Sequence, residues 1–199
     1  MRVLGSLLAS SLATLLALAS RPLPAAAEDT PGRVVSFGIG GGVSVPMGDA
    51  KDAYKTGFNG QAYVRLDLGA IPLALRGDFT YQSFDVHLAH FANVIGATGG
   101  TGTLLAGVAS TQVYLLRGNL RPYVLAGLGA YTLKTELDGT TVPSASETHF
   151  GIDGGVGLLA TIGLLSLYAE GHVDNVYTDR HLTQSNAFQI VPVTLGIVF

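Results

Sequence analysis

Two arginines and two aspartates lie on either side of one short connector. Arg65 and Asp67 end one segment of alternating residues, and Arg76 and Asp78 begin the next, across residues 69–72. Within each pair the residues are two positions apart, so in extended strands all four side chains project from the same face. A guanidinium beside a carboxylate forms charge-assisted and often bidentate hydrogen bonds. We therefore expect Arg–carboxylate ion pairs here.

Glu170 and His172 lie two positions apart in a later segment. We expect them at a similar level along the strands and include them in this candidate cluster. The full cluster comprises Arg65, Asp67, Arg76, Asp78, Glu170 and His172. Charges removed from water must be paired, and the interior of a small barrel holds only packed side chains or one small ligand. The first interpretation is a structural plug that keeps a lumen shut. The second is a narrow gated pore whose ion pairs exchange partners.

Catalytic and metal-binding alternatives require other residues in defined arrangements. A hydrolase or acyltransferase would bring a serine, a histidine and an acidic residue together near the outer lipid surface. The five histidines are His87, His90, His149, His172 and His181. The serines near the expected external rim are Ser83, Ser144, Ser146 and Ser185. No pair has a diagnostic spacing, and His87-x-x-His90 has no further ligand cluster. We therefore predict no catalytic residue, no metal site and no cofactor.

The elements that position these residues are segments in which apolar residues alternate with small or polar ones. Eight such segments cover residues 35–45, 58–68, 73–82, 104–116, 123–134, 150–158, 165–174 and 191–199. Their length, about ten residues, is what a tilted membrane strand needs. Connectors alternate between short (69–72, 117–119, 161–163) and long (46–57, 85–102, 135–148, 178–187). The pattern predicts an all-β fold, an eight-stranded antiparallel up-and-down transmembrane β-barrel.

The two faces of these segments decide whether the barrel meets lipid or water outside. A soluble lipocalin is also an eight-stranded barrel, but it points apolar residues inward around a ligand. Here the charged residues share a face with small residues, which suit a crowded lumen, namely Gly38, Gly40, Gly42, Gly155 and Gly157. The chain also has no Trp, so the Gly-x-Trp element of lipocalins is missing. We therefore expect the apolar face to contact the bilayer.

Facing is less regular in the fourth and fifth segments. The outward set of the fourth is assigned to Ala109, Thr111, Val113 and Leu115. Gly127 and Gly129 of the fifth are assigned inward by analogy with the first segment. An aromatic girdle at the outer rim is expected from Tyr54, Tyr81, Tyr131 and Tyr177.

The final segment alternates apolar residues up to the aromatic residue at position 199. Val193, Leu195, Ile197 and Phe199 project from one face. This ending resembles the C-terminal insertion signal of bacterial outer-membrane barrels, which the barrel-assembly machinery reads. Pro192 is at odds with a closed barrel because it has no N–H to donate. We expect a bulge or a broken hydrogen bond where the last strand meets its neighbour.

The first 27 residues are typical of a secretory signal peptide. A positive start precedes an apolar stretch without acidic residues, and Ala25-Ala26-Ala27 fits the cleavage site. The predicted domains are therefore a signal peptide (1–27) and a barrel (28–199). Arg2 and Arg21 account for two of the 11 basic residues, so nine remain against 14 acidic ones. This balance disfavours nucleic acid as a partner, and without cysteine the chain forms no disulfide.

These features resemble one family over essentially the whole mature chain. The motifs that carry the resemblance are the signal peptide, residues 45–49 (VPMGD), 121–129 (RPYVLAGLG), 150–152 and 154–157, 168–171 (YAEG) and the final Phe199. Together they resemble the small outer-membrane β-barrel (porin-like) family, which includes the barrel domain of outer membrane protein A and outer membrane protein X. The chain lacks the peptidoglycan-binding domain of protein A, so no cell-wall tether is implied.

The resemblance implies a monomer in the bacterial outer membrane, with both termini periplasmic and four long loops external. Its partners would be the lipid bilayer, lipopolysaccharide and, during insertion, the barrel-assembly machinery. The mixed charges of the long connectors are expected to be mostly solvated; the alternative, argued from the residues alone, is that Lys51, Lys55, Lys134 and Arg180 contact lipopolysaccharide phosphates. Members of this family often have no assigned activity. The predicted function is a structural or surface-interaction role with a mostly plugged polar lumen. A narrow low-conductance channel is the alternative, and a lipid-modifying enzyme comes third.

Overall fold

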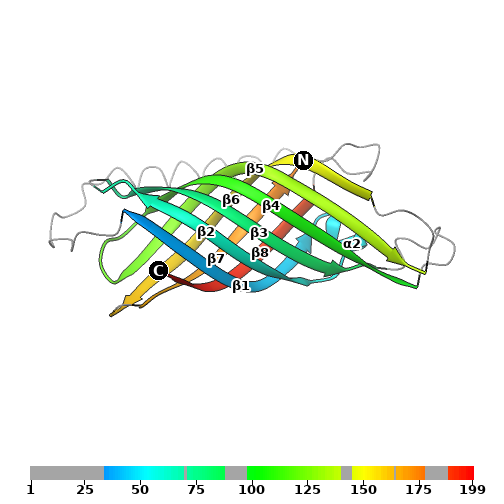
Figure 1. Ribbon diagram of the computed structural model, residues 1–199, viewed down its shortest axis with the longest axis horizontal. Coiled ribbons are helices and arrows are strands. Elements are labelled where there is room, and N and C mark those ends of the chain that lie inside the picture. Colours follow the sequence, from blue (N-terminus) through cyan, green and yellow to red (C-terminus); the bar gives the residue numbers. More distant parts are fainter. Residues whose placement is uncertain (1–33, 70, 88–97, 140–144, 164, 178–187) are drawn as a thin grey trace, which may run out of the picture. The chain divides into compact units, whose positions relative to one another are not determined.

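The computed structural model describes residues 34–69, 71–87, 98–139, 145–163, 165–177 and 188–199. They contain eight β-strands and one short helix (Figure 1). The elements are β1 (Val35–Met47), α2 (Ala50–Ala53), β2 (Gly57–Asp67), β3 (Leu73–Asp85), β4 (Gly99–Tyr114), β5 (Leu120–Asp138), β6 (Ala145–Ile162), β7 (Leu165–Val176) and β8 (Phe188–Val198). The predicted signal peptide, residues 1–27, lies outside the described residues.

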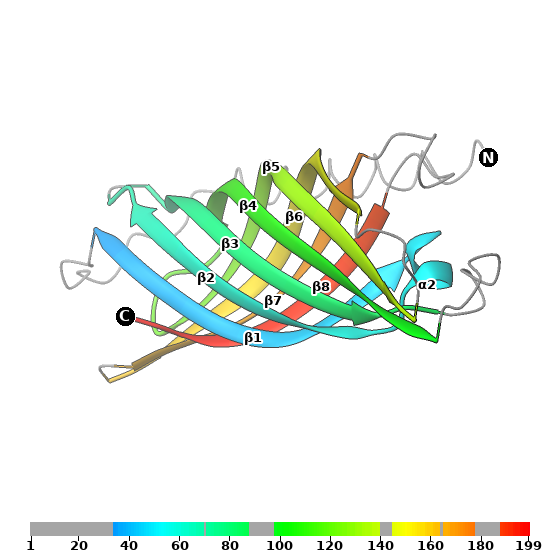
Figure 2. The same ribbon diagram turned by 45° about the vertical axis from the view of Figure 1, so that its right-hand side comes forward.

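The eight strands form one closed antiparallel barrel in chain order. β1 pairs with β2 on one side and with β8 on the other, so the sheet has no free edge along this seam. Following paired residues once round the barrel leads from Phe37 back to Met47, a stagger of ten residues. Such a stagger requires steeply tilted strands, which cross the view obliquely in Figure 2. The predicted up-and-down barrel is confirmed.

The barrel has a turn end and a loop end, and the two names are kept below. The connectors β2–β3, β4–β5 and β6–β7 lie at the turn end together with Phe199; α2 lies at the loop end (Figure 1). Gly69 and Gly163 in two of the short connectors have φ angles of 67° and 63°. This left-handed conformation is readily available only to glycine, which explains why such short connectors reverse the chain here.

The outer face of the barrel is apolar. Large hydrophobic side chains exposed there include Phe37, Ile39, Phe58, Val64, Phe79, Phe150, Ile152, Val156 and Leu195. The facing predicted for the two irregular segments is confirmed: Ser110 and Gln112 are buried, and Leu128, between Gly127 and Gly129, is 57% exposed. A closed barrel pairs its backbone groups internally, which is what a lipid environment demands. No helix among the described residues is long and apolar enough to cross a membrane.

The predicted aromatic girdle is half wrong. Tyr81 and Tyr177 are exposed and stand beside outward phenylalanines, but Tyr54 and Tyr131 are buried. Tyr131 lies at an odd position in β5, the same parity as the inward Gly129, so alternation turns it into the lumen. Tyr54 belongs to a connector that folds over the lumen instead of standing at the rim.

The strands at the loop end are longer than predicted. β4 begins at Gly99, β5 continues to Asp138, and β6 begins at Ala145. Residues 135–138 and 145–148, expected in a loop, therefore extend a ladder in which Thr135 opposes Ala145. Charged residues in this stretch do not end the strands, because the paired backbone satisfies its own hydrogen bonds. The helix α2 in the first long connector was not predicted either.

Pro192 interrupts the ladder between β7 and β8. Pairing runs as far as Gly171 with Val193 and resumes at Asp174 with Ile190. The register is the same on both sides of the gap, so no residue has been inserted. The missing N–H of proline thus produces a local break in the ladder and not a bulge, which is one of the two outcomes predicted.

Inward glycines make room for tyrosine rings in the narrow lumen. In three places a glycine lies directly opposite a tyrosine on the neighbouring strand, and a Cβ atom at the glycine would overlap the ring. The pairs are Gly38 with Tyr63, Gly157 with Tyr123 and Gly196 with Tyr168. Small residues therefore set how closely the aromatic side chains can fill the barrel.

Candidate functional site: the charged layer of the lumen

Arg76 on β3 is the centre of a buried ion-pair network. Its Nη1 and Nη2 atoms donate to Glu170 Oε2 and Oε1 on β7 at 2.9 and 2.7 Å, and its Nε donates to Asp78 Oδ1 at 2.8 Å. The guanidinium also lies 3.6 Å from the centroid of the Tyr63 ring. Two strands on different sides of the barrel are thereby joined across the lumen by a bidentate pair, the geometry in which Arg–carboxylate contacts are strongest.

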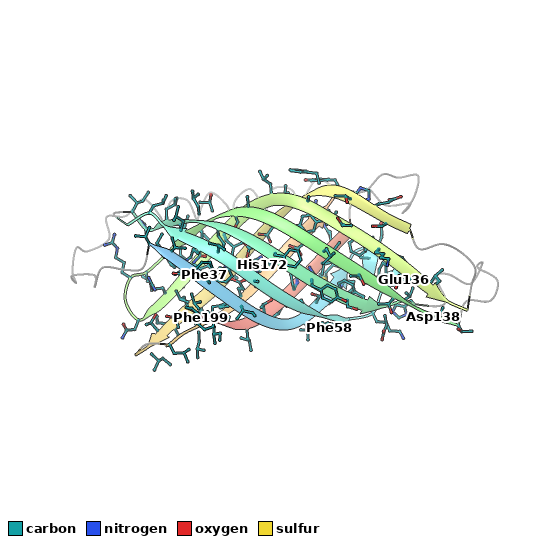
Figure 3. All side chains as sticks on the ribbon, viewed as in Figure 1. Phe37, Phe58, Glu136, Asp138, His172 and Phe199 are labelled. Carbon is teal, nitrogen blue, oxygen red and sulfur yellow. The ribbon has the colours of Figure 1, made fainter. Side chains whose placement is uncertain are left out.

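Glu170 is held from two further directions. The hydroxyl of Tyr123 donates to its Oε2 at 2.6 Å. His172 Nε2 lies 3.1 Å from its Oε1, in an orientation that makes no hydrogen bond. The other ring nitrogen of His172, Nδ1, lies 2.8 Å from Asp153 Oδ2 and is hydrogen-bonded to it. His172 thus stands between two carboxylates near the middle of the barrel (Figure 3).

Arg65 and Asp67 form a separate group closer to the turn end. Arg65 Nε donates to Asp67 Oδ2 at 3.2 Å, and its Nη2 donates to Ser36 Oγ at 3.2 Å. Arg65 and Arg76 are directly opposite in the β2–β3 register. Like charges in that position repel, and each arginine pairs with the carboxylate two residues along its own strand. The six residues singled out in the sequence therefore fall into two groups, not one.

Several residues of the network were not singled out in the sequence. Tyr63, Tyr123, Asp153 and Asp174 all contact members of the cluster or its neighbours. Their inward facing follows from the same alternation that places Glu170 inside. The missing information was the stagger between strands, because it decides which residues of β3, β6 and β7 share a height in the barrel.

The loop end of the lumen is closed by a different kind of packing. An apolar cluster fills it, comprising Ala50, Tyr54, Phe84, Val86, Leu104, Ala106, Val108, Tyr131, Val176, Phe188 and Ile190. Tyr54, just after α2, contacts the Phe188 ring edge-on at 5.6 Å between centroids, and its hydroxyl hydrogen-bonds Thr135 Oγ1 at 2.7 Å. The first long connector is therefore part of the seal over the charged layer. The sequence interpretation anticipated a polar lumen and missed this apolar cap.

Within the described ranges, no hydrogen bond joins the side chain of His87, His149 or His172 to a serine considered for catalysis. His172 contacts carboxylates in the lumen, and His149 lies 3.3 Å from Glu147. Ser83 and Ser146 belong to strands, and neither histidine hydrogen-bonds a serine. His90, His181, Ser144 and Ser185 lie outside the described residues, as does Arg180.

The four residues of the predicted insertion signal lie on the outer face of the last strand. Val193, Leu195 and Phe199 are exposed and Ile197 is half-buried. The backbone of Phe199 exchanges two hydrogen bonds with Phe37, at 2.8 and 3.2 Å. Figure 3 places these two phenylalanines near the turn end, opposite Glu136 and Asp138.

Solved structures of bacterial outer-membrane proteins share this architecture. Neisserial surface protein A (NspA) has a TM-score of 0.58 at 13% identity, covering 82% of this chain and 94% of that one. Ail, the attachment invasion locus protein of Yersinia pestis, has a TM-score of 0.54 at 14% identity, covering 83% and 97%. A major outer membrane protein of Thermus thermophilus has a TM-score of 0.50 at 11% identity, covering 83% and 98%. At these identities the likeness shows the fold alone.

A search of curated proteins found no match. The family model described as "Outer membrane protein beta-barrel domain" matches residues 11–181, most of the chain. The closed eight-stranded barrel, its apolar outer face and this match agree: the chain belongs to the outer membrane protein β-barrel domain family.

Proposed function

We propose that this protein is a monomeric barrel of the bacterial outer membrane with a structural or surface-interaction role and a closed lumen. The observation that carries the proposal is the Arg76–Glu170 pair, which joins β3 to β7 across the lumen with both side chains buried. The apolar cluster at the loop end is a second seal above it. Because the lumen is closed at two levels, a role for the outer surfaces of the barrel is better supported than transport through its interior.

The orientation we propose puts the turn end in the periplasm and the four long connectors outside the cell. Short turns on one side and longer strands and connectors on the other are typical of outer-membrane barrels. In this arrangement residues 1–27 are removed as a signal peptide. Val193, Leu195, Ile197 and Phe199 would present their lipid-facing side to the barrel-assembly machinery during insertion.

The charge of the loop end limits the chemical class of partner that can bind there. Among the described residues there, six carboxylates face three lysines: Asp49, Asp52, Asp85, Glu136, Asp138 and Glu147 against Lys51, Lys55 and Lys134. Lys134 is paired with Glu136 at 2.5 Å. Ail has been solved with the heparin analogue sucrose octasulfate, but an acidic surface repels such a polyanion. We propose a neutral or basic surface partner here, with lipopolysaccharide phosphates contacted only locally through Lys51 and Lys55.

Single-channel recording tests the closed lumen. The chain, purified from outer membranes, is inserted into a planar bilayer, and insertion is verified by protease resistance. We expect no discrete conductance steps. Steps whose size changes in Arg65→Ala or Arg76→Ala would contradict the proposal and identify the ion pairs as a gate.

A narrow channel is the second candidate, because a small polar cavity lies within the charged layer beside His172 and Thr194. A lipid-modifying enzyme is the third. We propose that the protein is not an enzyme. An altered lipid A mass in cells that express the chain would contradict this, and an unchanged mass is expected.

A further inference from the structure

The middle of the lumen carries more buried acid than base. Asp78, Asp153, Glu170 and Asp174 are four carboxylates, and the only basic groups that contact them among the described residues are Arg76 and His172. Arg76 is fully engaged by Glu170 and Asp78. His172 alone therefore faces the pair Asp153 and Asp174. Buried charge must be balanced, so this pair needs either a shared proton or a further cation.

The three side chains converge. One ligand atom each of Asp153, His172 and Asp174 lies within 4.8 Å of the others, and all three residues are buried. They come from adjacent strands, with Asp153 directly opposite Asp174 in the β6–β7 register. His172 is beside the point where Pro192 interrupts the β7–β8 ladder. The convergence therefore lies at the height where the barrel's own backbone pairing is incomplete.

Unsatisfied polar atoms surround the same carboxylates. The hydroxyl of Tyr131 is fully buried near Asp174 and lacks a hydrogen bond of good geometry. Gln82 donates through Nε2 to Asp174 Oδ2 at 3.1 Å, while its Oε1 has no partner. Buried polar atoms of this kind usually mark the place of a water molecule or an ion.

A cavity opens beside the three converging side chains. It is lined by Asp153, His172 and Asp174 together with Asp78, Gln61 and Thr194. The centre of a water molecule can move through about 20 Å³ of it, which is more than the roughly 10–15 Å³ that one water needs. The space suits a single ion with a bound water and excludes an organic ligand.

We propose that Asp153, His172 and Asp174 form a buried site for one divalent transition-metal ion. An imidazole nitrogen with two carboxylates is a ligand set for ions such as Zn²⁺ or Mn²⁺, whereas Ca²⁺ and Mg²⁺ favour oxygen ligands throughout. The ion supplies the missing positive charge. His172 releases a proton to the solvent when it coordinates. The site would tie β6 to β7 at the level where the neighbouring β7–β8 ladder is interrupted.

Metal counting on the folded barrel tests the site. The full chain in detergent is stripped with EDTA and dialysed separately against Zn²⁺ and Mn²⁺, and bound metal is measured by plasma mass spectrometry. We expect one equivalent of at least one ion per barrel, and none in Asp153→Asn/Asp174→Asn. His149→Gln, which removes a histidine beside Glu147 at the loop end, is the matched control and should keep the full equivalent.

Thermal unfolding gives a second readout, which does not require the metal to stay bound through dialysis. The bound ion should raise the unfolding midpoint of the wild type and leave the double variant unchanged. In EDTA the double variant should unfold at a higher temperature than the wild type, because two buried acids have become neutral amides. The proposal is overturned if the folded wild type binds neither ion, if the double variant retains metal, or if His149→Gln abolishes binding.

Discussion

The middle of the lumen is packed with charged groups and tyrosine hydroxyls, whereas the lumen at the loop end is packed with aliphatic and aromatic carbon. Arg76, Glu170 and Tyr123 close the first region through directed contacts of 2.6–2.9 Å. Tyr54, Phe84 and Phe188 close the second through ring packing. Directed contacts fail when one partner is lost, but apolar packing weakens in proportion to the volume removed.

The largest effect should come from breaking the bidentate pair. Arg76→Met leaves Asp78 buried without its cation and Glu170 with only His172 beside it, so the free energy of unfolding should fall by about 3–5 kcal/mol. Urea titration of the refolded barrel measures this, followed by circular dichroism because the chain contains no Trp. Arg76→Met/Glu170→Gln should regain part of the loss.

Arg65→Met, on the neighbouring strand β2, is the control. Its partner Asp67 has a side chain that is 25% exposed, so water can replace the lost arginine and the loss should be about 1 kcal/mol. Equal losses at positions 65 and 76 would show that burial of the pair does not set its strength.

The second largest loss of stability should come from filling the space that Gly157 leaves for the Tyr123 ring. Gly157→Ala drives a methyl group into the Tyr123 ring, and overpacking of this kind costs about 1–3 kcal/mol. Because the displaced ring belongs to the residue that bonds Glu170, the loss should also loosen the ion-pair network.

Gly154→Ala on the same strand is the matched control, since an added Cβ there meets no atom within 4 Å. The same urea titration should find its stability unchanged or slightly raised. A loss at Gly154 as large as that at Gly157 would mean that strand flexibility, and not the tyrosine ring, is what glycine serves.

The third effect tests the apolar closure. Tyr54→Ala removes the ring that packs on Phe188 and the hydrogen bond to Thr135, and should lower the free energy of unfolding by about 2 kcal/mol. Tyr54→Ala should show no conductance steps in a planar bilayer, because the charged layer still closes the lumen. Conductance steps in this variant alone would show that the loop end, and not Arg76, is the effective barrier.

Alternation in the sequence was sufficient for the strands and for the side on which Arg65, Arg76 and Glu170 project, because a strand has a fixed period of two. It was insufficient for Asp153 and Asp174, since their proximity to His172 depends on the stagger of the whole barrel. No local pattern encodes that stagger; it emerges when the eighth strand closes on the first.

The burial of Tyr54 and the helix α2 could not be predicted for a different reason. Four residues of helix in a connector leave almost no periodic signal, and the fold of this segment follows from the apolar cluster it covers. Tyr131 belongs inside the lumen by its parity in β5, although its position along the strand matches that of a rim residue. Parity is the stronger guide in a barrel, since a wrong face would put a residue in lipid instead of in the lumen.

The smallest change in the free energy of unfolding should come from an ion pair that belongs to neither region. Lys134 and Glu136 contact each other at the loop end with side chains 45% and 56% exposed. Water and salt screen such a pair, so Lys134→Ala should change the free energy of unfolding by less than about 0.5 kcal/mol. The urea titration used for Arg76→Met measures both variants under the same conditions. A loss at Lys134 near that at Arg76 would contradict the view that burial, and not the number of ion pairs, makes the charged layer strong.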